Sequence, residues 1–225
     1  MTRLDGIWAV VPVKEFGSAK QRLSRFLTQE QRRALAACMV EDVLEALAAV
    51  PELAGILVVT EEPVAIHLAQ RYGAETSTDG ARSGHTGAVA AAARRLAREG
   101  RAGMMTMPGD IPAITAAEVS AILAAHKPAP SFTIVPAHDE LGSNAVVVSP
   151  PDALPLQFGD NSYFPHLDSA RRADLTPTIV RQPGIAMDID HPADLASFLR
   201  MKSAHPTRTR TFLQEIKAGE AIPWP

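Results

Sequence analysis

Three aspartates follow apolar stretches of the chain in a pattern that suits metal-dependent chemistry. Asp110 comes soon after the apolar stretch 103–107, and Asp188 and Asp190 stand two residues apart near the C-terminal end of the sequence. In an extended segment, residues two apart point to the same side, so both carboxylates can meet one ligand. Carboxylate oxygens beside phosphates are what Mg²⁺ binds, with water and substrate completing its shell. A solvated turn at Asp110 and a helix cap at Asp190 are the alternative interpretations.

A cationic loop near the N-terminus could hold the phosphates. Residues 7–13 are apolar and β-branched, as in a buried strand, and Lys14, Lys20 and Arg22 follow them. We expect a helix to begin near Lys20, which would turn backbone N–H groups and the positive end of a helix dipole toward an anion. The loop therefore predicts phosphate or nucleotide binding, and an ordinary strand–helix connection with solvated cations is the alternative. Neither a P-loop nor a dinucleotide-binding glycine pattern is present.

Two further segments could contact a small anionic ligand. The glycine-rich stretch 80–87, which we interpret as a loop ahead of a helix, could meet a base, a ribose or a phosphate, although a plain turn has the same composition. Residues 142–144 and 158–166 combine glycines and hydroxyls with His166, one helical turn after Ser162. This combination suits an oxyanionic small molecule, and the histidine itself is more often structural than catalytic. No cysteine and histidine spacing indicates a zinc site.

The elements that must position these residues alternate between strand and helix in the first half of the chain. The patterns predict strands over 7–13, 56–60, 74–78 and 103–107, and helices over 28–50, 63–72, 88–99 and 116–125. Such alternation is typical of a parallel sheet with helices on both faces, where ligands bind outside the carboxyl ends of the strands. Later segments predict an antiparallel excursion and two more helices, with strands over 132–136, 145–149 and 178–180 and helices over 162–173 and from 192 to 199.

We therefore expect an α/β fold, a three-layer α/β/α single domain with a mostly parallel, Rossmann-like central sheet. The domain would span residues 1–202, and a C-terminal tail would span 203–225 with a short helix over 212–217. The antiparallel strands over 132–149 offer one surface on which a homodimer could form.

Composition excludes several classes of partner. The chain has 225 residues, 46% of them hydrophobic, a net charge of −3 and a pI of about 6.2, so no overall positive field favours nucleic acid or an anionic membrane. Cys38 is the single cysteine, which excludes an intrachain disulfide and suits a reducing compartment. No apolar run is long enough to span a bilayer, and the N-terminus lacks the apolar core of a secretory signal. We expect a cytoplasmic protein with neither nucleic acid nor membrane as a partner.

Several motifs together resemble one enzyme family. They are Pro12-Val13-Lys14 with Ala19-Lys20-Gln21-Arg22-Leu23, Gly109-Asp110-Ile111-Pro112, Phe158-Gly159-x-x-Ser162 with His166, and the run from Pro183 to Leu195 that contains Asp188-Ile189-Asp190. From about Trp8 to Leu199 the chain resembles the 2-phospho-L-lactate and phosphoenolpyruvate guanylyltransferases of deazaflavin coenzyme F-420 biosynthesis. That family lies within the glycosyltransferase-A-like nucleotidyltransferases.

The resemblance implies a reaction and a role for each candidate residue. The phosphate of a three-carbon acid (2-phospholactate, phosphoenolpyruvate or 3-phosphoglycerate) would attack the α-phosphorus of GTP and expel pyrophosphate. Mg²⁺ is the implied cofactor. The implied roles are nucleotide binding for Pro12, Val13, Lys14, Ser18, Lys20, Gly84 and Thr86, acceptor binding for Asn144, Gly159 and Ser162, metal binding for Asp110, Asp188 and Asp190, and catalysis for Lys20 and Asp110.

Elementary chemistry agrees with that reaction, because an ionised phosphate is already a nucleophile and needs no strong base. Catalysis then consists of positioning and charge neutralisation, which lysines, Mg²⁺ and helix N-termini supply. Two alternatives stay open: a sugar-phosphate or molybdopterin-type nucleotidyltransferase, and a non-catalytic nucleotide-binding regulatory module. Gly84-His85-Thr86-Gly87-Ala88 stands where the family usually has a Leu-Asn-Ala type sequence, so base selection is a separate question.

Overall fold

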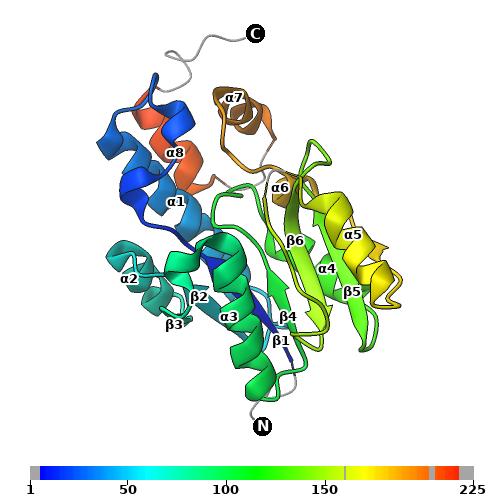
Figure 1. Cartoon of the computed structure of the whole chain (residues 1–225). Coiled ribbons are helices and arrows are strands. Elements are labelled where there is room, and N and C mark those ends of the chain that lie inside the picture. The colour runs from blue at the N-terminus through cyan, green and yellow to red at the C-terminus, as the bar shows by residue number, and fades with distance from the viewer. Residues whose placement is uncertain (1–5, 160, 203–205, 218–225) are drawn as a thin grey trace.

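The computed structural model describes residues 6–159, 161–202 and 206–217, and its middle layer is a seven-stranded sheet (Figure 1). The strands lie in the order β3-β2-β1-β4-β6-β5-β7. Only β6 runs antiparallel to its neighbours β4 and β5, and the other pairs are parallel. The mostly parallel sheet with an antiparallel excursion is therefore confirmed. The strands are β1 (Ile7–Pro12), β2 (Gly55–Val59), β3 (Glu75–Ser77), β4 (Gly103–Thr106), β5 (Ser131–Pro136), β6 (Ser143–Ser149) and β7 (Thr178–Ile179).

Helices cover both faces of the sheet and complete the expected three layers (Figure 1). Along β1, Ala9 and Val11 join the core beneath α1, whereas Trp8 and Val10 join the core beneath α3, as a strand buried on both faces requires. One face carries α1 (Gln29–Ala48), α2 (Pro63–Arg71), α4 (Ala116–Ala125), α6 (Pro183–Ala186), α7 (Pro192–Arg200) and α8 (Arg208–Glu215), and the other carries α3 (Gly84–Arg98) and α5 (Tyr163–Arg172).

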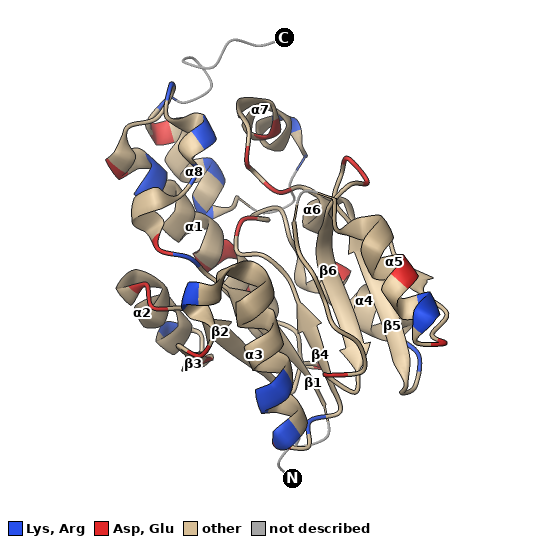
Figure 2. Ribbon diagram, in the orientation of Figure 1, with Lys and Arg blue, Asp and Glu red and all other residues tan. Residues whose placement is uncertain are grey.

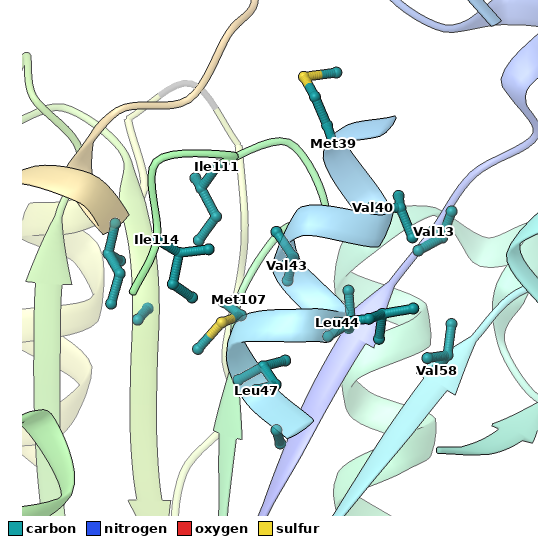
Figure 3. Close-up of a cluster of buried hydrophobic side chains, with 14 of the residues drawn as sticks. Val13, Met39, Val40, Val43, Leu44, Leu47, Val58, Met107, Ile111 and Ile114 are labelled. Carbon is teal, nitrogen blue, oxygen red and sulfur yellow. The ribbon is translucent and has the colours of Figure 1, made fainter. Parts of the chain in front are cut away.

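Packing against α1 fixes the loop that follows β4. Figure 3 shows Ile111 and Ile114 of this loop on the same side of α1 as Val43, and both isoleucines are buried. A Cβ on Gly109 would lie 2.9 Å from Cγ2 of Val40, so glycine permits the loop to approach the helix this closely. Asp110, between Gly109 and Ile111, is thus held on a well-anchored stretch of backbone.

Charged residues lie mainly outside the central strands. Figure 2 shows the long strands of the sheet in tan, with acidic and basic segments in the loops and on the outer helices. Among the described residues, no helix combines the length and the apolar character needed to cross a membrane.

The beginnings of two helices differ from the sequence-based expectation. No α-helix begins near Lys20, because two short 3₁₀ turns, Phe16–Ser18 and Gln21–Leu23, occupy the loop. Helix α1 begins at Gln29, where Thr28 and Gln31 form a capping box. Helix α3 begins at Gly84 rather than at residue 88, so the second half of the expected glycine-rich loop is the first turn of this helix.

The C-terminal helix lies earlier than expected and packs on α1. The expected helix over 212–217 is α8, and the Asp42 carboxylate of α1 accepts hydrogen bonds from the backbone N–H groups of Arg208 and Thr209 at its start. Leu213 is fully buried. Residues 203–205 and 218–225 of the expected tail lie outside the described part. Strands β5 and β6 are buried, and each has a neighbouring strand on both sides, although β7 pairs with only Thr133 and Ile134 of β5; the homodimer stays a prediction.

Candidate active site

Two adjoining cavities lie at the carboxyl ends of β1 and β4, the edge where open α/β sheets bind ligands. The larger cavity has a volume of about 830 Å³ and the smaller one about 320 Å³, and Lys14, Asp110 and Asp190 line both. The structure brings every sequence-predicted site residue to one or both. The smaller cavity is lined by Pro12, Val13, Lys14, Ser18, Lys20, Asp110 and Asp190, and the larger by Lys14, Gly84, Thr86, Asp110, Asn144, Gly159, Ser162, Asp188 and Asp190.

Lys20 joins two of the three aspartates. Its Nζ donates to Oδ2 of Asp110 at 2.5 Å and to Oδ1 of Asp190 at 2.8 Å, and only 8% of its side chain is exposed. Burial by itself would lower the pKa of Lys20, but the charges of both carboxylates outweigh it and raise the pKa above its ordinary value. Lys20 therefore remains a cation throughout the physiological pH range. Arg22 adds a weaker contact, 3.5 Å from Oδ2 of Asp190.

The backbone that presents Lys20 is held by residues outside the cationic loop. Lys20 itself takes a left-handed conformation with φ of 52°, which is costly for a residue with a Cβ and is commonest at functional sites. Glu62, buried at the start of α2, accepts from the N–H of Phe16 at 2.9 Å. Arg32 of α1 donates to the carbonyl oxygens of Ala19 and Leu27 at 3.3 Å and 2.9 Å. These contacts fix the strained residue in place.

A backbone hydrogen bond brings the C-terminal aspartates to Asp110. The N–H of Ile189 donates to the carbonyl of Asp110 at 3.1 Å, and the Ile189 side chain is fully buried. Asp188 and Asp190 on either side of it both line the larger cavity, as the two-residue spacing predicts. Asp190 is not the cap of α7, because the Asp194 carboxylate accepts from the N–H groups of Asp190 and His191.

Asn144 of β6 holds Asp188 in position. Its Nδ2 lies 3.0 Å from Oδ1 of Asp188 and 3.0 Å from the carbonyls of Ile185 and Ala186. Burial raises the pKa of Asp188 above its ordinary value; the Asn144 hydrogen bond opposes this, and the charges of Asp110 and Asp190 add to it. The Asn144 amide nitrogen is thus occupied with the protein and has no free hydrogen for the acceptor contact that sequence analysis assigned to this residue.

The carboxylates suit a hard divalent cation in their chemistry. All three line the larger cavity, and the like charges that raise the pKa of Asp188 are what a cation would offset. Within the described ranges, however, no three His, Cys, Asp or Glu side chains form a preformed metal cluster. A cation would thus take its other ligands from substrate phosphates and water, which is usual for Mg²⁺.

The N-terminus of α3 opens onto the larger cavity. Gly84 has a φ of 72°, a conformation that residues with a Cβ rarely adopt, and it leads into the first turn of this fifteen-residue helix. N–H groups at such a terminus favour phosphate. The hydroxyl of Thr86 is occupied, because it accepts from the N–H of Phe158 at 2.9 Å and lies 3.3 Å from the Phe158 carbonyl. Thr86 can therefore serve a nucleotide through its backbone.

His85 stands between the two cavities and lines both. Its ring packs against Phe158 with centroids 4.4 Å apart, and its Nε2 is buried without a hydrogen-bond partner among the described residues. Burial lowers the pKa of His85 to about 4; Asp110 opposes this and Lys14 adds to it. Sequence analysis assigned His85 no role.

The expected acceptor residues lie on β6 (Asn144), just before α5 (Gly159) and at the N-cap of α5 (Ser162). A Cβ on Gly159 would meet nothing within 4 Å, so the space beside this glycine is open. The Ser162 hydroxyl donates to that of Ser143 at 3.2 Å. Sequence analysis included Ser143 in the segment 142–144 that suits an oxyanion, but it did not assign Glu62 or Arg32 to the site.

Comparisons with known proteins show the family of the chain. The chain matches the family model described as "Guanylyl transferase CofC like" over residues 7–220. It is 35% identical over 193 residues to the phosphoenolpyruvate guanylyltransferase of Rubrobacter xylanophilus, covering 84% of this chain and 92% of that protein. It is 32% identical over 186 residues to the 3-phospho-D-glycerate guanylyltransferase of Colwellia psychrerythraea, covering 83% and 88%.

The fold has counterparts among solved structures. A putative nucleotide-diphospho-sugar transferase from Desulfovibrio desulfuricans G20 superposes with a TM-score of 0.74 at 20% identity, over 95% of this chain and 96% of that one. This likeness concerns the fold alone, whereas the family match spans nearly all of the described chain. The protein belongs to the CofC-like guanylyl transferase family and is an enzyme of the nucleotidyltransferase class.

Proposed function

We propose that this enzyme is a Mg²⁺-dependent guanylyltransferase that transfers GMP from GTP to a phosphorylated three-carbon acid. An oxygen of the acceptor phosphate forms a bond to the α-phosphorus of GTP, the bond from that phosphorus to the oxygen bridging to the β-phosphate breaks, and pyrophosphate leaves. Phosphoenolpyruvate, 2-phospholactate and 3-phosphoglycerate are the candidate acceptors. We assign the product to deazaflavin coenzyme F-420 biosynthesis or a paralogous pathway, which suits a cytoplasmic enzyme.

The observation that carries this proposal is the pair of adjoining cavities with Asp110, Asp190 and Lys14 at their boundary. The smaller cavity, with the cationic loop, and the N-terminus of α3 would hold the triphosphate. The wall formed by Asn144, Gly159 and Ser162 would hold the acceptor acid. The reacting phosphates then meet at the boundary, where the charged groups are concentrated.

Charge neutralisation is the chemistry that the residues supply. Lys20, held as a cation by two carboxylates, would stabilise negative charge that develops on the transferring phosphate. Asp110, Asp188 and Asp190 would hold Mg²⁺, which would neutralise the phosphates and orient them. No residue is needed as a strong base, because the acceptor phosphate is ionised at neutral pH.

A pyrophosphate-release assay tests this function and its alternatives together. GTP, ATP and CTP are each combined with phosphoenolpyruvate, 2-phospholactate, 3-phosphoglycerate and glucose-1-phosphate in the presence of Mg²⁺. Release with GTP and one three-carbon acid is the expected result. Release with another nucleotide or with the sugar phosphate would assign a different nucleotidyltransferase activity, and silence with bound GTP would favour a non-catalytic module. The double variant Asp110→Asn with Asp188→Asn should be inactive, and turnover at the wild-type rate would refute the metal site.

A further inference from the structure

A histidine and two serines form a hydrogen-bonded chain on the acceptor wall of the larger cavity. His166 of α5 is 1% exposed, and its Nδ1 lies 3.0 Å from Oγ of Ser143. Ser162 lies 3.2 Å from Ser143 on the other side. Both serines are buried and line the cavity, whereas His166 does not line it. The histidine therefore reaches the cavity only through the serines.

The backbone decides which nitrogen of His166 carries hydrogen. The N–H of Gln157 donates to Nε2 at 3.0 Å, so Nε2 is an acceptor and the hydrogen of the neutral ring lies on Nδ1. Burial, with a smaller effect of His85, lowers the pKa of His166 to about 4 and keeps the ring neutral near pH 7. The Phe158 ring packs edge-on against it, with centroids 4.9 Å apart. His166 therefore donates to Ser143.

Counting hydrogens shows what this chain offers to a ligand. Ser143 accepts from His166 and from Ser162, so its own hydroxyl hydrogen remains available. If the two serines exchange roles, the hydrogen of Ser162 remains instead. With the other tautomer of His166, Ser143 would donate to the ring and Ser162 to Ser143, and none would remain. The tautomer thus determines whether the serine pair can act as a donor.

We propose that His166 is a positioning residue that orients the Ser143–Ser162 pair to donate a hydrogen bond to an anionic oxygen of the acceptor acid. The inference rests on the proposed function, because the acceptor is the anion assigned to this wall. Hydrogen bonds to charged groups are the stronger kind, and losing one weakens binding by about ten- to a hundredfold.

Kinetics with phosphoenolpyruvate as the acceptor probe tests this positioning role. We expect His166→Leu and Ser143→Ala each to raise the KM for phosphoenolpyruvate by about ten- to a hundredfold, with the KM for GTP changed by less than about twofold. His166→Asn places an amide nitrogen near the Nδ1 position and should recover most of the loss. The double variant of His166→Leu with Ser143→Ala should have a KM for phosphoenolpyruvate no higher than that of the single variant with the higher KM. Both substitutions remove the same hydrogen bond to the acceptor, so their effects should not add.

A second histidine, which is half-buried, provides the matched control. His126 also contacts hydroxyls, Thr133 at 2.9 Å and Ser149 at 3.0 Å, at the opposite end of β6. His126→Leu removes similar hydrogen bonds far from the cavity and should leave both KM values unchanged. If His166→Leu does not fold, Ser143→Ala and His166→Asn carry the comparison.

Two results would overturn the proposal in distinguishable ways. An active wild type with an unchanged KM for phosphoenolpyruvate in Ser143→Ala and His166→Leu, or with equal changes for phosphoenolpyruvate and GTP, would overturn the positioning role alone. A wild type that releases no pyrophosphate from GTP with any of the three acids would overturn the proposed function and this inference with it.

Discussion

Replacing Lys20 by Met tests whether its ammonium neutralises the carboxylates of Asp110 and Asp190. The ammonium lies 2.5 Å and 2.8 Å from them, and 8% of the Lys20 side chain is exposed. Removing one partner of a fully buried pair costs about 3–5 kcal/mol. Because 29% and 43% of the two aspartate side chains are exposed, solvent screening reduces the expected loss to about 1–3 kcal/mol. For a chain of this size, Tm would fall by roughly 2–12 °C.

The loss of unfolding free energy in Lys20→Met depends on pH, and the contacts of Asp190 determine the direction of this dependence. Burial by itself would raise the pKa of Asp190, but the charge of Lys20 holds it below its ordinary value. Such a carboxyl stabilises the fold above its unfolded pKa, about 3.9, and the stabilisation is lost as pH falls through the folded pKa. In Lys20→Met, burial still raises the pKa of Asp190 but the charge of Lys20 no longer opposes it. Protonation of Asp190 at acid pH therefore removes the unpaired charge and lessens the destabilisation of the variant. The difference in unfolding free energy is therefore largest near pH 7 and shrinks below about pH 5.

Urea denaturation at pH 7 and pH 4 measures this difference. Lys14→Met is the control, because Lys14 is exposed, lines the smaller cavity as Lys20 does and has no carboxylate partner among the described residues. It should change the unfolding free energy by less than about 0.5 kcal/mol. Pyrophosphate release by Lys20→Met should fall at least about a hundredfold. A Lys20→Met variant as stable as the wild type at pH 7, or equally destabilised at both pH values, would refute the reasoning.

Three further substitutions test other parts of the site and fold. Asp188→Asn should leave the unfolding free energy at pH 7 no lower than that of the wild type, since the raised pKa of Asp188 marks an unfavourable charge. Its pyrophosphate release should fall at least about a hundredfold. The control Asp168→Asn, on the exposed side of α5, should stay fully active. Glu62→Ala should cost about 1–3 kcal/mol in urea titrations, because the Phe16 N–H loses its buried acceptor, and Glu62→Gln should cost clearly less. Leu213→Ala should cost about 2–5 kcal/mol in thermal unfolding, and a loss below about 0.5 kcal/mol would show that α8 contributes little to the core.

Local patterns in the sequence predicted those features that depend on neighbouring residues. Helices α1 and α4 begin within one residue of the expected starts, each at a capping box, Thr28 with Gln31 and Thr115 with Glu118. The alternation of Asp188, Ile189 and Asp190 predicted two carboxylates on one side, and the buried isoleucine between them agrees. These signals work because the relevant contacts lie within a few residues along the chain.

Two local predictions were wrong for identifiable reasons. The glycines at 84 and 87 suggested a loop, yet Gly84 supplies the positive φ that starts α3. Gly87 lies inside the helix, where glycine is needed because a Cβ would come within 2.2 Å of the Ser83 Cβ. The cations around Lys20 suggested a helix start, but Lys20 takes a left-handed conformation between two short turns. At Lys20, the ion pairs with the distant Asp110 and Asp190 outweighed local propensity.

The contacts that hold the site in place share a reason for escaping sequence analysis, including those of Asn144, a residue that was itself assigned to the site. The Glu62 carboxylate accepts from the backbone N–H of Phe16, and the backbone N–H of Gln157 donates to His166. The side chains of Arg32 and Asn144 donate to backbone carbonyls. A backbone group has no residue type, so such a contact leaves no motif at its partner, and the sequence separations reach forty residues or more for Glu62 and Asn144. The charged groups that meet phosphate are readable because their chemistry is in their side chains. Their supports, including the tautomer of His166, become readable only once the fold shows which backbone atoms face them.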